Sequence, residues 1–239
     1  MKFCVARVIG NELPPRDEEG SRIKSLEFIL KNENFKPPRV WILNRIYDEE
    51  RLIVLKNILR GERVFEIPFV RKEYMRCKNH NQKIHYATNI NPARNFALKK
   101  GIEGNDFVFV LDGDCFFERK IYEDTIEEIK EDQKANNIKY YGIPTIRLES
   151  SLKNKTEAML VFRKDADILL DENIVFGNGD KIRFINLMGL KMLSGYVCHK
   201  SFSKSEIEDD VELRIKLRSK SLSCLVNHLD RGMARKWHL

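Results

Sequence analysis

The sequence predicts an α/β fold: one domain with a mostly parallel central sheet and helices on both of its faces. Short apolar runs rich in β-branched residues alternate with segments of helical periodicity over residues 2–134, a pattern typical of such sheets. The run FVFVL at 107–111 is continuously apolar, as expected of a central strand buried on both faces. The length of 239 residues suits one large domain, and no internal repeat or low-complexity linker divides the chain.

The alternation predicts each element in turn. Ser21 is a candidate N-cap for the first helix, and Asn91 with Pro92 supplies a cap and first-turn residue for the third. The segment 68–90 is polar and is expected to be a loop. The expected strands are 2–9, 39–43, 63–67 and 107–111, and the expected helices are 21–32, 49–60, 92–100 and 118–134.

Composition narrows the class of protein. Forty-three Lys and Arg against 36 Asp and Glu give a net charge of +7, which suits phosphate-bearing ligands, an anionic surface or simple solubility. The five cysteines have no C-x-x-C spacing, so a disulfide framework is not expected. No stretch approaches the ~20 apolar residues of a membrane helix, and the first residues do not read as a secretory signal. We therefore expect a cytoplasmic protein.

The stretch DGD follows the most apolar strand directly. In open α/β sheets, ligands bind at the carboxyl ends of the strands, where Asp112 and Asp114 would emerge. With the flexible Gly113 between them, both carboxylates can converge on one point and would then need a cation. Hard oxygen ligands select Mg²⁺ or Mn²⁺. The alternative is that DGD is only a turn, since Asp and Gly are common turn residues.

Two further stretches carry a resemblance to a known family. NPARNFALKKG (91–101) precedes the Asp-x-Asp strand, and residues 160–181 contain an Phe-Arg pair and a later Asp-Glu before a predicted helix. In this order the motifs resemble the family-2-like, nucleotide-sugar-dependent glycosyltransferases of the GT-A fold, in a divergent form similar to bacterial and large-DNA-virus enzymes. The likeness spans about residues 2–201. Asn91-Pro92 stands where glycine is usual, and Gly179-Asp180 stands where Glu-Asp is usual.

The resemblance implies a GT-A-like, Rossmann-like domain over residues 1–239. Its nucleotide-sugar-binding half would be about 1–115 and its acceptor and catalytic half about 116–200. The remainder, about 201–239, would be a C-terminal helix with a basic tail. That tail would also suit an anionic membrane surface.

The resemblance also assigns roles to individual residues. Asp180 would be the general base, with Glu157 in reserve, although Asp180 is equally a good helix N-cap. The alternatives for the others are an exposed strand arginine at 7, a solvated helix-face arginine at 94 and a strand-end histidine satisfied by backbone at 199. The expected donor contacts are Arg7, Asn44, Arg94, Asp112 and Gly113, and the expected metal ligands are Asp112, Asp114 and His199.

The implied activity is metal-dependent, inverting transfer of a sugar from a nucleotide-diphosphate donor to a hydroxyl of a glycan, glycolipid or glycoprotein. A nucleotidyltransferase is the first alternative, but it usually has a Gly-rich loop with Arg or Lys after the first strand, and GNELPPR has one glycine. A basic nucleic-acid-binding or nucleic-acid-modifying protein would explain the charge. It also predicts aromatic residues interleaved on a basic face, which the sequence does not clearly show.

Overall fold

The computed structural model describes residues 1–12, 17–148, 155–173 and 190–199. Within these ranges nine strands form one sheet in the order β3-β2-β1-β4-β7-β6-β9-β5, with β8 paired to β6. The strands are β1 (Phe3–Ile9), β2 (Arg39–Asn44), β3 (Val64–Ile67), β4 (Phe107–Asp112), β5 (Cys115–Phe116), β6 (Tyr140–Arg147), β7 (Lys155–Arg163), β8 (Lys191–Met192) and β9 (Val197–His199). The helices are α1 (Ser21–Asn32), α2 (Glu49–Ile58), α3 (Arg71–Arg76), α4 (His80–Thr88), α5 (Ile90–Ile102) and α6 (Arg119–Ala135).

The first four strands form the parallel half of the sheet. β1 pairs in parallel with β2 and with β4, and β2 pairs in parallel with β3. The carboxyl ends of these four strands therefore meet at one edge of the sheet, called here the carboxyl edge. β7 is antiparallel to both β4 and β6, so the sheet as a whole is mixed. The predicted α/β class is confirmed.

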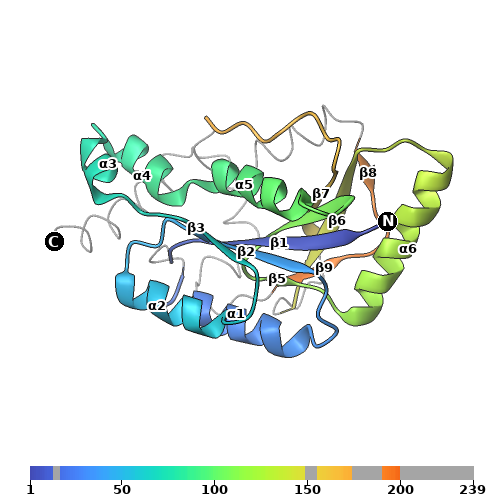
Figure 1. Cartoon of the computed structure of the whole chain (residues 1–239), viewed down its shortest axis with the longest axis horizontal. Coiled ribbons are helices and arrows are strands. Elements are labelled where there is room, and N and C mark those ends of the chain that lie inside the picture. Colours follow the sequence, from blue (N-terminus) through green and yellow to red (C-terminus); the bar gives the residue numbers. More distant parts are fainter. Residues whose placement is uncertain (13–16, 149–154, 174–189, 200–239) are drawn as a thin grey trace.

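Helices cover both faces of the sheet, as the sequence predicts (Figure 1). α1 and α2 pack through Leu26 and Leu55 against Trp41 on one face, and α6 continues along that face near β4. α5 packs on the opposite face of the sheet. There Ala97 packs against the strand side chains that point to that face. Residues 107–111 are at most 5% exposed, which confirms that β4 is buried on both sides.

Three predicted boundaries are corrected by the structure. Ser21 is the first residue of α1, and the N-cap is Gly20 in a left-handed conformation at φ 79°. α5 begins at Ile90, so Asn91 lies inside the helix and not at its cap. The expected loop at 68–90 contains α3 and α4. Asn89, at φ 43°, both ends α4 and caps α5, because asparagine tolerates the left-handed conformation better than most residues do.

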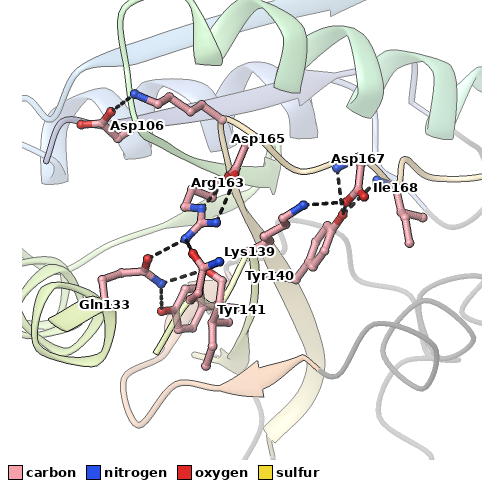
Figure 2. Close-up of polar contacts among 12 residues, drawn as sticks. Asp106, Gln133, Lys139, Tyr140, Tyr141, Arg163, Asp165, Asp167 and Ile168 are labelled. Carbon is pink, nitrogen blue, oxygen red and sulfur yellow. Dashed lines mark hydrogen bonds and ion pairs between the residues drawn. The ribbon is translucent and has the colours of Figure 1, made fainter. Parts of the chain in front are cut away.

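The segment 164–173, which has turns at both ends and no regular secondary structure between them, runs beside α5 on the same face of the sheet. We call it the strap. It starts at the amino edge, opposite the carboxyl edge, where Figure 2 shows a polar cluster around the end of β7. There Arg163 binds Asp165 and the Gln133 side chain of α6, and the Tyr140 hydroxyl accepts from the backbone N–H of two strap residues, at 167 and 168. The cluster fixes where the strap begins.

The remaining predictions on elements concern residues outside the described ranges. The expected C-terminal helix and basic tail at 201–239 and the helix expected after residue 180 fall there. In the part of the chain that the structure describes, no helix combines the length and the apolar character that crossing a bilayer requires.

Candidate functional site

The two aspartates of DGD lie at the carboxyl edge of β4 and have different partners. Asp112 is the last residue of β4, and its Oδ1 accepts a hydrogen bond of 2.7 Å from Nη2 of Arg94 in α5. Asp114 Oδ2 lies 3.3 Å from Nη1 of Arg22 in α1 and 3.1 Å from Nε2 of His199 at the end of β9. The sequence predicted one shared cation between the carboxylates. In the structure each has an arginine, and the two arginines come from helices on opposite faces.

Gly113 is required by packing. A Cβ atom at this position would lie 2.8 Å from the backbone oxygen of Val8 and 3.2 Å from Ile9. Since the first of these neighbours is backbone, it has little freedom to move away. The sequence attributed this glycine to flexibility, whereas the structure attributes it to the close approach of the DGD turn to β1.

Arg22 is a residue of the site that sequence reasoning missed. Its Nη2 donates to Asp17 Oδ2 at 2.9 Å, besides the contact with Asp114. Burial by itself lowers the pKa of Arg22, but the charges of Asp17, Asp114 and Asp112 outweigh it and raise the pKa, so the guanidinium stays charged. A signal was available: Arg22 lies in the first turn of a helix, where acidic residues are favoured.

Arg7 is not at the carboxyl edge surface, where the resemblance placed it as a donor contact. Its side chain is 0% exposed and forms a buried ion pair with Glu33, which follows α1. Arg7 Nε donates to the carbonyl of Cys115 at 2.8 Å, and Glu33 Oε1 accepts from the backbone N–H of Phe117 at 2.9 Å. The pair therefore anchors the chain just after DGD. The inward alternation of β1 puts the guanidinium in the core, over Trp41.

Asn44, another expected donor contact, is also buried, at 1% exposure, and its side chain binds other parts of the protein. Its Nδ2 donates to the carbonyl of Thr88 at 2.8 Å, and its Oδ1 accepts from Nδ2 of Asn89 at 2.8 Å. Asn44 thus fixes the junction between α4 and α5. By fixing the junction, Asn44 also fixes the start of α5, the helix that carries Arg94.

The polar residues of the NPARN stretch contact two different places, the DGD site and the strap. Arg94 binds Asp112, as described above, with its side chain 13% exposed. Asn91 Nδ2 donates to the carbonyl of Asp171, and Asn95 donates to the carbonyl of Leu170 and accepts from its N–H. The two asparagines are one helical turn apart, so they hold the strap along the side of α5.

The carboxylate and imidazole of Asp114 and His199 are close enough for a single cation to contact both. Among the described residues no group of three or more His, Cys, Asp or Glu side chains is arranged to hold a metal. A two-residue site fits Mg²⁺ or Mn²⁺ only when water and phosphate oxygens complete the shell, which is how Mg²⁺ is usually bound. Asp114 and His199 therefore fit Mg²⁺ or Mn²⁺ when water and phosphate oxygens supply the other ligands.

The side chains of the two candidate general bases lie outside what the structure describes. Position 157 lies within β7, but the Glu157 side chain is outside what the structure describes, and Asp180 falls in the undescribed range 174–189. Cys198 is poorly suited to act as a nucleophile. Burial, together with the charge of Glu118, raises the pKa of Cys198, next to His199, to about 12.

An open hollow of about 610 Å³ lies beyond the ends of β2 and β3. Arg45 and Asn89 line it, and both have left-handed backbone conformations, at φ 48° and 43°. The Arg45 guanidinium lies 3.8 Å from the ring centre of Tyr86 and donates to its carbonyl. Pro92 of α5 also lines the hollow, whereas Arg94, Asp112 and Asp114 do not line it.

Comparisons with known proteins give a likeness in structure. No protein-family model matches the chain, and no curated protein matches it in sequence. A 4-diphosphocytidyl-2C-methyl-D-erythritol synthase from Anaerococcus prevotii is 12% identical with a TM-score of 0.43, over 92% of this chain and 96% of that one. The glucosyl-3-phosphoglycerate synthase of Mycobacterium tuberculosis, solved with Mg²⁺ and uridine diphosphate, is 12% identical with a TM-score of 0.38, over 83% of this chain and 71% of that one.

A third structure, mannose-1-phosphate geranyltransferase from Thermus thermophilus, is 14% identical with a TM-score of 0.34, over 70% of this chain and 51% of that one. Identities and TM-scores this low establish neither an activity nor a ligand for this chain. What the fold and the site do define is an α/β protein whose paired carboxylates, histidine and arginines gather at the carboxyl edge of a parallel half-sheet.

Proposed function

We propose that the protein is a glycosyltransferase that moves a sugar from a nucleotide-diphosphate donor to a hydroxyl acceptor. The observation that carries the proposal is the gathering of Asp112, Asp114, His199, Arg22 and Arg94 at the carboxyl edge. Ligands bind at this edge in open α/β sheets, and the mixture of carboxylates and guanidinium groups suits a diphosphate with its cation.

Each described side chain has a role in this proposal. Arg22 and Arg94 would donate to the diphosphate, whose negative charge grows as the glycosidic bond breaks. Asp114 and His199 would hold Mn²⁺ or Mg²⁺, which supplies further neutralisation of the leaving diphosphate when bound. Asp112 would contact the sugar and ribose once Arg94 turns to the phosphates.

The reaction requires a base on the acceptor side. The acceptor hydroxyl oxygen would attack the anomeric carbon, the bond from that carbon to the diphosphate oxygen would break, and Asp180 or Glu157 would accept the hydroxyl proton. Attack from the face opposite the leaving group inverts the configuration.

A thermal-shift screen of nucleoside diphosphates and nucleotide sugars, with and without Mn²⁺, tests donor binding. A ligand that binds only the native state raises its melting temperature. Asp114→Asn should lose the metal-dependent part of that rise, whereas Asp124→Asn, at an exposed position of α6, should keep it. Asp114→Asn should also lower the stability of the free protein slightly, because the carboxylate has Arg22 and His199 as partners. If Asp114→Asn responds to donor and Mn²⁺ like the wild type, the proposed site is wrong.

The products separate glycosyl transfer from nucleotidyl transfer. Glycosyl transfer releases a nucleoside diphosphate, whereas a nucleotidyltransferase acting on a nucleoside triphosphate releases inorganic pyrophosphate. Chromatography of the products formed from nucleotide sugars and from nucleoside triphosphates therefore decides between the two activities. Release of pyrophosphate alone would replace the proposed reaction with nucleotidyl transfer.

A further inference from the structure

We infer that Arg22 is the counter-ion of Asp114 in the ligand-free protein, and that a diphosphate must draw it away before a divalent cation binds tightly there. The inference deepens the proposed function and rests on it for the identity of the ligand. It assigns to Arg22 the coupling of diphosphate binding to cation binding.

Arg22 contacts the same oxygen atom that a cation would use. Asp114 Oδ2 lies 3.3 Å from Arg22 Nη1 and 3.1 Å from His199 Nε2. A cation held between Asp114 and His199 would therefore bind beside the guanidinium. Two positive groups that share one carboxylate oxygen repel each other, and burial strengthens the repulsion because the side chain of Asp114 is only 12% exposed.

Arg22 has a second partner, Asp17, which can still bind the guanidinium after it has left Asp114. Its Nη2 donates to Asp17 at 2.9 Å, which is shorter than the contact with Asp114. The backbone N–H of Arg22 is bound by Glu12, so the start of the side chain is fixed. Movement of the guanidinium about this fixed point breaks the longer contact and keeps the shorter one.

The surroundings of Arg22 are already anionic, so a diphosphate would replace the carboxylate of Asp114 as its partner. Arg22 lies in the first turn of the twelve-residue helix α1, and that turn contains no acidic residue. The positive end of the helix and the guanidinium have charge of the same sign, and Glu12 and Asp17 already neutralise part of it. A diphosphate that binds Arg22 frees Asp114 Oδ2 for the cation. By linkage, a bound cation then favours diphosphate binding to the same extent.

Two binding measurements on the full chain test the inference without any turnover. In the first, electron paramagnetic resonance measures Mn²⁺ binding to the nucleotide-free protein. Arg22→Gln should bind Mn²⁺ about tenfold more tightly than the wild type, which corresponds to about 1.4 kcal/mol. In the second, calorimetry in chelator measures the binding of inorganic pyrophosphate without metal. Here Arg22→Gln should bind about tenfold more weakly, because it has lost a charged donor.

The matched control is Arg60→Gln, which removes the same charge at an exposed position after α2 and should change neither affinity. Opposite shifts for Mn²⁺ and pyrophosphate support the inference, since a merely structural role of Arg22 would weaken both. Weakening of both, or no change in either, overturns it.

The variant Asp114→Asn shows whether a negative result concerns the inference about Arg22 or the proposed function. If Asp114→Asn loses Mn²⁺ while Arg22→Gln binds it like the wild type, the cation site stands and the inference about Arg22 is wrong. If Arg22→Gln binds no Mn²⁺ at all, the inference is also wrong. The donor screen and product identification then judge the transferase separately.

Discussion

Replacing Arg7 by methionine should destabilise the protein severely, and it also removes the hydrogen bond to the Cys115 carbonyl just after DGD. Methionine keeps much of the volume but leaves Glu33 as a buried charge, and both side chains of the pair are 0% exposed. Removing one partner of a buried ion pair costs about 3–5 kcal/mol. Glu33 keeps a hydrogen bond from the Phe117 N–H and a 3.8 Å contact with Arg39, so we expect the lower end, about 3 kcal/mol.

The double variant Arg7→Met with Glu33→Gln should recover about 1–2 kcal/mol of this loss, since it removes the buried charge that has lost its main partner while the amide oxygen still accepts from Phe117. Urea unfolding followed by circular dichroism measures the free energies. The fluorescence of Trp41, whose ring lies 5.2 Å from the Arg7 guanidinium, is a second probe of the same transition. Because Trp237 also fluoresces, the fluorescence series uses a Trp237→Phe background.

The control is Arg63→Met, which breaks the exposed ion pair with Glu103 and should cost no more than about 1 kcal/mol. An Arg7→Met variant as stable as this control would refute the argument. So would a double variant no more stable than Arg7→Met alone. If Arg7 instead contacted the donor, nucleotide affinity would fall while the urea midpoint stayed unchanged.

Three further predictions follow from contacts near the site and at the far edge. Gly113→Ala should cost about 1–3 kcal/mol in urea unfolding, because the new methyl group meets a β1 carbonyl at 2.8 Å; a neutral result would contradict the packing. Asn95→Ala should cost about 2 kcal/mol, since it removes bonds to both backbone groups of Leu170, and an unchanged thermal midpoint would show that these bonds contribute nothing. Burial raises the pKa of Asp132, but hydrogen bonds, the first of them from Lys191, outweigh it and hold the pKa below 3.8. The resulting stability is present above the unfolded-state pKa and is lost as pH falls through the lower folded value, so Asp132→Asn should flatten the acid side of the stability curve in urea titrations at several pH values.

The parts of the fold that sequence could predict are those set by local pattern. The apolar run of β4, the strands of the parallel half and helices α1, α2, α5 and α6 follow from periodicity, and the structure confirms them. α3 and α4 were missed because they are short and polar, and because their boundary depends on Asn89 in a left-handed conformation. No local pattern encodes the hydrogen bonds from Asn44 and Asn89 that hold this junction.

The site was predictable to a lesser degree. The place of Asp112 and Asp114 at the carboxyl edge follows from the strand that precedes them. Arg22 does not, because it is 92 residues from Asp114 in the chain. Arg94 and His199 were expected at the site only through the family resemblance, and the structure places them beside Asp112 and Asp114. Arg7 shows the opposite error. A charged residue near a strand end was expected to face a ligand, whereas strand alternation turns it into the core, where Glu33 compensates it.

The strap has a consequence for native-state hydrogen exchange. Its amides at 167 and 168 donate to the Tyr140 hydroxyl and its amide at 170 donates to the side chain of Asn95, so side chains hold these amides. Rotation of two side chains releases all three amides while the ladder between β4 and β7 stays intact. We expect the strap to open as a separate cooperative unit, with an opening free energy below that of global unfolding. Its amide protons should exchange together, earlier than those of β4, and Asn95→Ala should accelerate the amide at 170 most.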